Sequence, residues 1–146
     1  MSHVATVDVN ITDLDALQAA CNRLGLELRR GQQTYKWFGH SVGDYPIPQG
    51  FTAEDLGKCE HAIVVPGHED AYDIGVIKRR DGRPGFCLQW DFYQGGYGMQ
   101  DRVGENCNKL AQSYAVCAAS KAAQRNGFQV QEQLRADGSI ALQFHK

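Results

Sequence analysis

The stretch DRVGENCNKLAQSYAVCAASKAAQRN, residues 101–126, decides the fold that we expect for this chain. Apolar residues recur along it at three- and four-residue steps: Val103, Cys107, Leu110, Ala111, Tyr114, Cys117, Ala118 and Ala122. This period puts one apolar stripe along a helix of roughly six turns. The pair Asn126-Gly127 ends the stretch and tolerates the positive φ of a helix C-terminal cap. We therefore predict one long helix from Asp101 to Asn126.

A hairpin follows this helix directly. Phe128 opens a strand, the pair Asp137-Gly138 marks a tight turn, and alternating apolar residues return at Ile140, Leu142 and Phe144. Residues that alternate in this way share one face of a strand. We expect the long helix to deliver the hairpin across its own apolar face.

The beginning of the chain predicts a strand, a helix and a second strand. Residues 4–9 alternate apolar and polar side chains, as a half-buried strand does. Thr12, with Asp15 three positions later, has the pattern of a helix capping box. The helix ends at Gly25 and carries a buried stripe of Leu14, Leu17, Ala20, Cys21 and Leu24. Residues 26–30 form the second strand.

Three further strands are expected at 61–65, 72–79 and 86–93, because short apolar runs there are separated by the turn signals Pro66-Gly67 and Asp81-Gly82. Short strands joined by tight turns pair antiparallel. The fold class is therefore α+β, with a single antiparallel sheet of about six to seven strands and two helices packed on one face. We expect one domain over residues 1–146.

Residues 35–58, which we call the excursion, lack any helical or strand period. Glycine and proline punctuate this segment, yet it holds five large apolar side chains: Trp37, Phe38, Tyr45, Ile47 and Phe51. Disordered linkers are poor in such residues. We expect an ordered loop that packs on the domain, with one short helical turn at 52–56.

The totals exclude several classes of protein. Net charge is −2, from 15 basic and 17 acidic side chains, whereas a general duplex-DNA binder carries a basic excess. No apolar run reaches the roughly 18 residues that span a bilayer, and the N-terminus lacks the pattern of a secretory leader. The five cysteines form no C-x-x-C pair. We therefore expect reduced thiols, a cytoplasmic location, and neither membrane nor duplex nucleic acid as partner.

Aromatic residues interleaved with cations give the strongest binding signal. Aromatic faces stack on bases, and arginine forks bind phosphate. The glycine-rich segment 95–98 precedes the predicted long helix, whose N-terminus favours an anion. The expected ligand-binding residues are Trp37, Arg79, Tyr93, Tyr97, Arg102 and Lys36. A solvated charged turn and ordinary core aromatics would produce the same pattern.

Metal and catalytic sites are less well supported. Cys59, His61, His68 and Asp70 are of the residue types that bind zinc, but no second pair completes a tetrahedral set, so we expect no metal and no cofactor. Asp73 and Asp91 on neighbouring strands could share a proton or a metal, or could simply accept hydrogen bonds. The helical stripes hold Cys21, Cys107 and Cys117, which we expect to be inert core thiols.

Several short motifs resemble a small family known as hypothetical chloroplast reading frame thirty-five, with members in algal plastids, cyanobacteria, other bacteria and phages. They are Met1-Ser2-His3, Asp13 to Leu17, Leu24-Gly25, Tyr72 to Gly75, Trp90-Asp91, Tyr114-Ala115, Gly127-Phe128 and Asp137 to Ile140. The chain departs from the shorter plastid members at residues 37–58, which resemble an insertion, and at the glycine-rich 95–98. The resemblance implies an α+β fold and supplies no reaction.

Three functions follow as hypotheses. The first is a non-enzymatic binding protein for a small nucleotide or similar phosphate-bearing metabolite, in one form a phage sponge that sequesters a nucleotide-derived immune signal. Trp37, Tyr93 and Tyr97 would stack on the base, and Arg79 and Arg102 would hold phosphate.

The second hypothesis is an accessory protein that docks onto a larger partner such as an ATPase, through residues 37–51. The third is hydrolysis of a nucleotide bond using Asp73, Asp91 or His68. We also expect a homodimer or higher oligomer, because an edge strand at 140–144 could pair across a two-fold axis.

Overall fold

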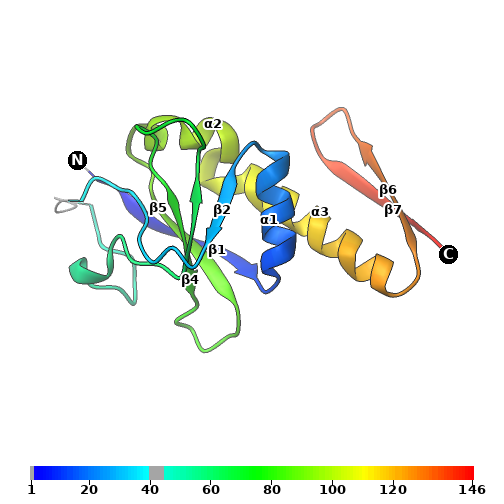
Figure 1. Cartoon of the computed structure of the whole chain (residues 1–146), viewed down its shortest axis with the longest axis horizontal. Coiled ribbons are helices and arrows are strands. Elements are labelled where there is room, and N and C mark those ends of the chain that lie inside the picture. Colours follow the sequence, from blue (N-terminus) through cyan, green and yellow to red (C-terminus); the bar gives the residue numbers. More distant parts are fainter. Residues whose placement is uncertain (1, 40–44) are drawn as a thin grey trace.

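The computed structural model describes residues 2–39 and 45–146, and the largest sheet in this part of the chain is antiparallel and five-stranded (Figure 1). Its strands lie in the order β1-β5-β4-β3-β2. They are β1 (Val4–Ile11), β2 (Glu27–Arg30), β3 (His61–Val64), β4 (Ile74–Lys78) and β5 (Phe86–Asp91). The α+β class and the antiparallel pairing are confirmed.

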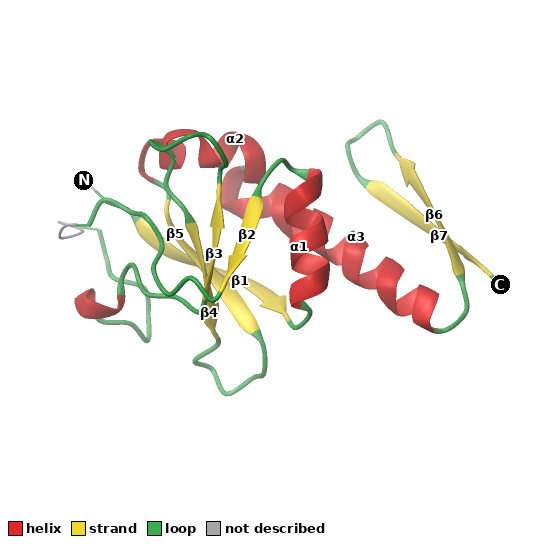
Figure 2. Ribbon diagram, viewed as in Figure 1, coloured by secondary structure: helices red, strands yellow, loops and turns green. Residues whose placement is uncertain are grey.

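Two helices, α1 (Leu14–Arg23) and α3 (Asn108–Arg125), pack beside one another and cover one face of this sheet (Figure 2). The largest buried cluster lies between them and the strands. It includes Leu17 and Cys21 of α1, Leu110 and Tyr114 of α3, and Ile63, Ile74, Leu88 and Trp90 of the strands. No helix in the described parts of the chain is long and apolar enough to cross a bilayer.

The prediction of one unbroken helix from 101 to 126 is wrong. The chain instead forms the short helix α2 (Met99–Val103), a 3₁₀ turn (Glu105–Cys107) and then α3. Gly104 has φ 82°, and a Cβ added there would overlap the Asn108 side chain, so a regular helix cannot continue through it. Val103 and Cys107 are both fully buried, so the apolar spacing survives the break.

The C-terminal end of α3 is as predicted. The N–H of Gly127 donates to the Gln124 carbonyl at 3.1 Å, and the N–H of Phe128 donates to the Ala123 carbonyl at 3.0 Å. These two bonds make a Schellman cap. The chain then reverses direction and enters the hairpin.

The single sheet of six to seven strands is also wrong. Strands β6 (Gln129–Leu134) and β7 (Ile140–His145) form a separate two-stranded sheet beside α3, away from the other five strands (Figure 1). The reason is length: α3 has 18 residues, and at about 1.5 Å per residue it carries the chain past the edge of the main sheet. Arg23 and Glu132 pair at 2.7 Å and connect the hairpin to α1.

The N-terminal cap of α1 differs from the prediction by one residue. Asp13, and not Thr12, accepts the N–H of Ala16, at 3.1 Å. Strand β1 continues to Ile11, and the Tyr114 hydroxyl accepts the N–H groups of Thr12 and Asp13 at 3.0 and 3.2 Å. Packing against α3 thus sets where the helix begins.

The excursion covers the other face of the main sheet, as predicted for its described residues, 35–39 and 45–58. A second buried cluster there contains Tyr35, Cys59, Ala62, Ile77 and Cys87, with Trp37 and Phe51 packed against it. The short helical turn lies at Ala53–Asp55 and has a capping box between Thr52 and Asp55. The sheet is therefore sandwiched between helices on one side and a loop on the other.

Candidate functional site

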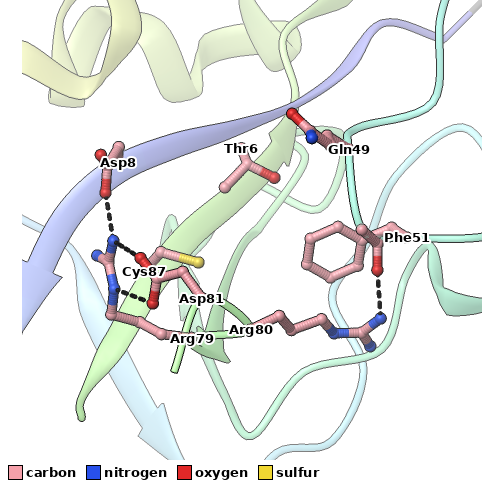
Figure 3. A pocket seen from close by; sticks show the side chains of 9 residues that line it. Thr6, Asp8, Gln49, Phe51, Arg79, Arg80, Asp81 and Cys87 are labelled. Carbon is pink, nitrogen blue, oxygen red and sulfur yellow. Dashed lines mark hydrogen bonds and ion pairs between the residues drawn. The ribbon is translucent and has the colours of Figure 1, made fainter. Parts of the chain in front are cut away.

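The first of two candidate sites lies where the excursion meets strands β1 and β5. We call it the basic-turn pocket, a cavity of about 510 Å³ (Figure 3). Its lining consists of Thr6, Asp8, Gln49, Gly50, Phe51, Arg79, Arg80, Asp81 and Cys87. It contains one of the six predicted binding residues, Arg79.

Arg79 is paired within the protein. Its Nη2 lies 2.6 Å from Asp8 Oδ1 and 2.7 Å from Asp81 Oδ2, and its side chain is 4% exposed. The guanidinium holds the pKa of the Asp81 carboxyl far below its usual range, chiefly by hydrogen bonding. Arg79 therefore joins the β4–β5 turn to β1, and most of its donors are unavailable to a phosphate.

Arg80 has a similar arrangement. Its guanidinium carbon lies 4.1 Å from the centre of the Phe51 ring, and its Nη1 donates to the Gly50 carbonyl and to Asp55 Oδ2 at 2.8 and 3.0 Å. Figure 3 shows Phe51 at the end of the pocket that also holds Thr6 and Gln49. Since each arginine has carboxylate partners, this pocket suits a planar, uncharged polar group better than an anion.

The second site depends on an unusual turn at residues 94–97. All four residues have positive φ, from 51° to 65°, which makes one left-handed turn. Gly96 is the buried member: a Cβ there would lie 3.4 Å from both the Trp90 ring and the Asp91 carbonyl. The turn points Tyr97 outward, where it is 47% exposed and meets Tyr72 edge to face at 5.0 Å.

Tyr97 and Arg102 share a small cavity of about 230 Å³, which we call the glycine-turn pocket. The rest of its lining is Val65, His68, Ala71, Gly98 and Asp101. Arg102 Nη1 donates to the Gly25 carbonyl at 3.4 Å, and among the described residues it forms no ion pair. Most donors of this guanidinium are thus available, in contrast to those of Arg79.

The helix after the glycine-rich turn is shorter than expected. We expected the long helix to offer its N-terminus to an anion, but α2 has only five residues. So few aligned peptide groups add little dipole charge. Any anion at this turn would depend on Arg102 itself.

The other three predicted residues lie outside both pockets. Trp37 is half-buried and its indole nitrogen packs directly on Gly57. The Lys36 ammonium donates to the Glu69 carbonyl. Tyr93 meets the His3 ring edge to face at 5.3 Å. The structure therefore brings together only Tyr97 and Arg102 of the six.

The two carboxylates Asp73 and Asp91 both hold the excursion on the sheet. Asp73 Oδ2 accepts the N–H of Lys36 at 2.8 Å, and burial raises the pKa of this carboxyl. Asp91 is fully buried and accepts the N–H groups of His3, Phe38 and Tyr93 at 2.9, 3.2 and 3.1 Å. This geometry favours the reading of both groups as hydrogen-bond acceptors.

The residues considered for zinc do not gather. Cys59 belongs to the cluster under the excursion, whereas His61 Nδ1 accepts the N–H of Gly31 at 2.9 Å and its ring meets Phe86. Across residues 2–39 and 45–146, no three His, Cys, Asp or Glu side chains lie close enough to hold a metal. His68 instead lines the glycine-turn pocket, a place that its sequence context did not indicate.

All five cysteines are free and buried, which confirms the expected inert core thiols. Burial raises the pKa of Cys21, Cys59 and Cys107 to about 12 in each case. A thiolate nucleophile is therefore disfavoured at neutral pH.

Comparison with known proteins gives one match. A family model described as "Protein of unknown function (DUF1257)" matches residues 20–143, and no curated protein or solved structure matches the chain. The matched range contains every residue of the glycine-turn pocket, whereas Thr6 and Asp8 of the basic-turn pocket precede it. Because the match spans most of the chain, from within α1 to within β7, the protein belongs to the DUF1257 family.

Proposed function

We propose that the protein binds a small nucleotide or a similar phosphate-bearing metabolite at the glycine-turn pocket, without turning it over. One observation carries this proposal: Arg102, with most of its donors available, lies in the same cavity as the exposed ring of Tyr97. A cation with available donors beside an open aromatic face is the combination that a nucleotide needs.

The pocket constrains the ligand. Its volume of about 230 Å³ lies below the roughly 300 Å³ at which typical ligand pockets begin, so the ligand is only partly enclosed. Phosphate would lie inside on Arg102 and His68, and the base would stack on Tyr97, worth about 1–3 kcal/mol. Asp101 at the rim repels highly charged groups, so a ligand with one or two phosphates fits better than a triphosphate.

One concrete form is a cytoplasmic sponge. The resemblance to the reading-frame-thirty-five family, which includes phage members, makes sequestration of a nucleotide-derived host signal a specific version of this proposal. Such a role requires tight binding and no lowering of a reaction barrier.

The test is thermal unfolding of the purified chain with mononucleotides, cyclic dinucleotides and ADP-ribose derivatives, followed by mass spectrometry of each mixture. A ligand at one hundred times its dissociation constant adds about 2.7 kcal/mol and raises the midpoint by several degrees. We expect a shift with the ligand recovered intact. Recovery of a cleaved ligand would favour hydrolysis, and no shift across the panel would contradict the proposal.

Variants identify which pocket is used. Tyr97→Leu and Arg102→Gln should each abolish the ligand-induced shift, because they remove the stacking face and the phosphate donor. Arg125→Gln, at the exposed end of α3, is the matched control and should leave the shift unchanged. If Phe51→Leu removes the shift and Tyr97→Leu does not, the ligand binds in the basic-turn pocket instead.

A second candidate is an accessory protein that docks onto a larger partner such as an ATPase. Two large side chains of the excursion, Phe38 and Ile47, are 40% and 37% exposed. These support a docking surface of limited size, since Trp37 and Phe51 of the same segment pack inward. Phe38→Ser should weaken capture of the purified candidate ATPase and leave ligand-induced stabilisation intact.

A further inference from the structure

The two sheets differ in how their edge strands are protected. Strand β1 carries Asp8 and a register shift between Val7 and Ile11, and β2 carries Glu27, Arg29 and Arg30. Charges and bulges on an edge strand block pairing with another chain. Residues 140–144 of β7 have no charge and no proline, and β7 pairs with β6 without a register shift. The β7 edge is therefore the unprotected one.

The backbone of β7 presents alternate residues to this open edge. The N–H of Arg135 donates to the Ser139 carbonyl at 2.8 Å, so these two residues form a hydrogen-bonded pair at the hairpin end. Because such pairs alternate along an antiparallel ladder, Ala141 and Gln143 face β6. The N–H and C=O groups of Ile140, Leu142 and Phe144 therefore point away from β6.

The same three residues carry their side chains on an apolar face that is only partly covered. The register aligns Val130 with Phe144 and Leu134 with Ile140 on this face. Leu134 is 74% exposed and Phe144 is 47% exposed. A two-stranded hairpin is marginally stable alone, and three or more strands with an apolar face are needed for stability.

We propose that β7 pairs antiparallel with β7 of a second copy of this chain, about a two-fold axis at Leu142. Each Leu142 faces its counterpart, and Ile140 faces Phe144 of the second copy, so the outward backbone groups are paired and the apolar faces become continuous. The two hairpins then form one four-stranded sheet.

Charge supports this arrangement over the alternative edge. The same register places Lys146 opposite Gly138 of the second copy, one residue from its Asp137, at both ends of the sheet. These opposite charges attract. Pairing through β6 about the equivalent position would place Glu132 against Glu132, and like charges directly opposite destabilise a sheet. An isologous β7 interface is therefore the self-complementary one.

Disulfide trapping tests the interface directly. In the proposed pair the Leu142 Cα atoms lie about 5.5 Å apart, within reach of a disulfide, and all five natural cysteines are buried. Leu142→Cys should therefore form a covalent dimer under mild oxidation. The matched variant Gln143→Cys, whose side chain lies on the opposite face and has no counterpart across the axis, should react at least tenfold more slowly. Equal rates would overturn the proposal.

Sedimentation equilibrium of the full chain gives an independent check. We expect a mass twice that of one chain at high concentration, and weaker association for Lys146→Glu. The double variant Asp137→Lys/Lys146→Glu exchanges the charges and should restore association, a result that a mere folding defect could not produce. A monomer at every concentration, or a dimer unaffected by both variants, would contradict this interface.

Discussion

Strands β5 and β6 have the same length and both pair antiparallel, but their side chains meet very different surroundings. Leu88 in β5 is fully buried, whereas Leu134 in β6 is 74% exposed. The main sheet has helices on one face and the excursion on the other, while the hairpin touches only α1 and α3 along part of one face (Figure 2). Strand formation is local, and burial depends on the layers that cover a strand.

The largest test of this comparison removes equal side chains from the two sheets. Leu88→Ala should lower the free energy of unfolding by about 2–5 kcal/mol, because it leaves a cavity in the core. Leu134→Ala should lower it by less than about 0.5 kcal/mol, as most exposed substitutions do. Urea unfolding at low protein concentration measures both. Similar losses would mean that the hairpin is buried as deeply as the main sheet.

A second test compares two aspartates that accept backbone hydrogen bonds. Asp91 takes three N–H groups inside the body, so Asp91→Ala should cost about 1–3 kcal/mol by leaving buried donors unpaired. Asp137 accepts the N–H and hydroxyl of Ser139 in the exposed hairpin turn, and Asp137→Ala should have little effect on unfolding. Asp91→Asn, which keeps an acceptor oxygen, should recover part of the loss.

The third test addresses the connection between the two regions. A double-mutant cycle of Arg23→Gln and Glu132→Gln should give a coupling energy of about 0.2–1 kcal/mol, since both side chains are partly exposed. Hydrogen exchange should become faster in the hairpin amides of both single variants. The exchange of β4 and β5 amides should stay unchanged, and a change there would show that the two regions unfold as one unit.

The smallest expected effect is a pH dependence confined to the main sheet. Burial lowers the pKa of His61, and its neutral Nδ1 accepts the N–H of Gly31. A depressed folded-state pKa means that this contribution is full above the unfolded value of about 6.5 and is lost as the pH falls through the folded value. His61→Asn keeps an acceptor without titrating there, so its unfolding free energy should decline less between pH 7 and pH 5. An unchanged slope would contradict this role.

Much of the candidate site was beyond the reach of sequence patterns. Arg79 has the context of a solvated cation, but its main partner, Asp8, lies 71 positions earlier and meets it only after β1 joins the sheet. Trp37 and Tyr93 have the composition of a stacking site, yet both pack within the body. Tyr97 and Arg102 were predictable as neighbours because five residues and one tight turn separate them.

The sequence by itself determined the features that depend on near neighbours. The apolar stripe of α3, its cap at Asn126 and Gly127, the turns at Pro66 and Asp81, and the alternation of the strands follow from local backbone preference and side-chain period. Only the tertiary structure decided the break at Gly104, the start of α1 at Asp13 and the separation of the hairpin from the main sheet. Each of these depends on contacts between segments that are distant along the chain, which no local pattern encodes.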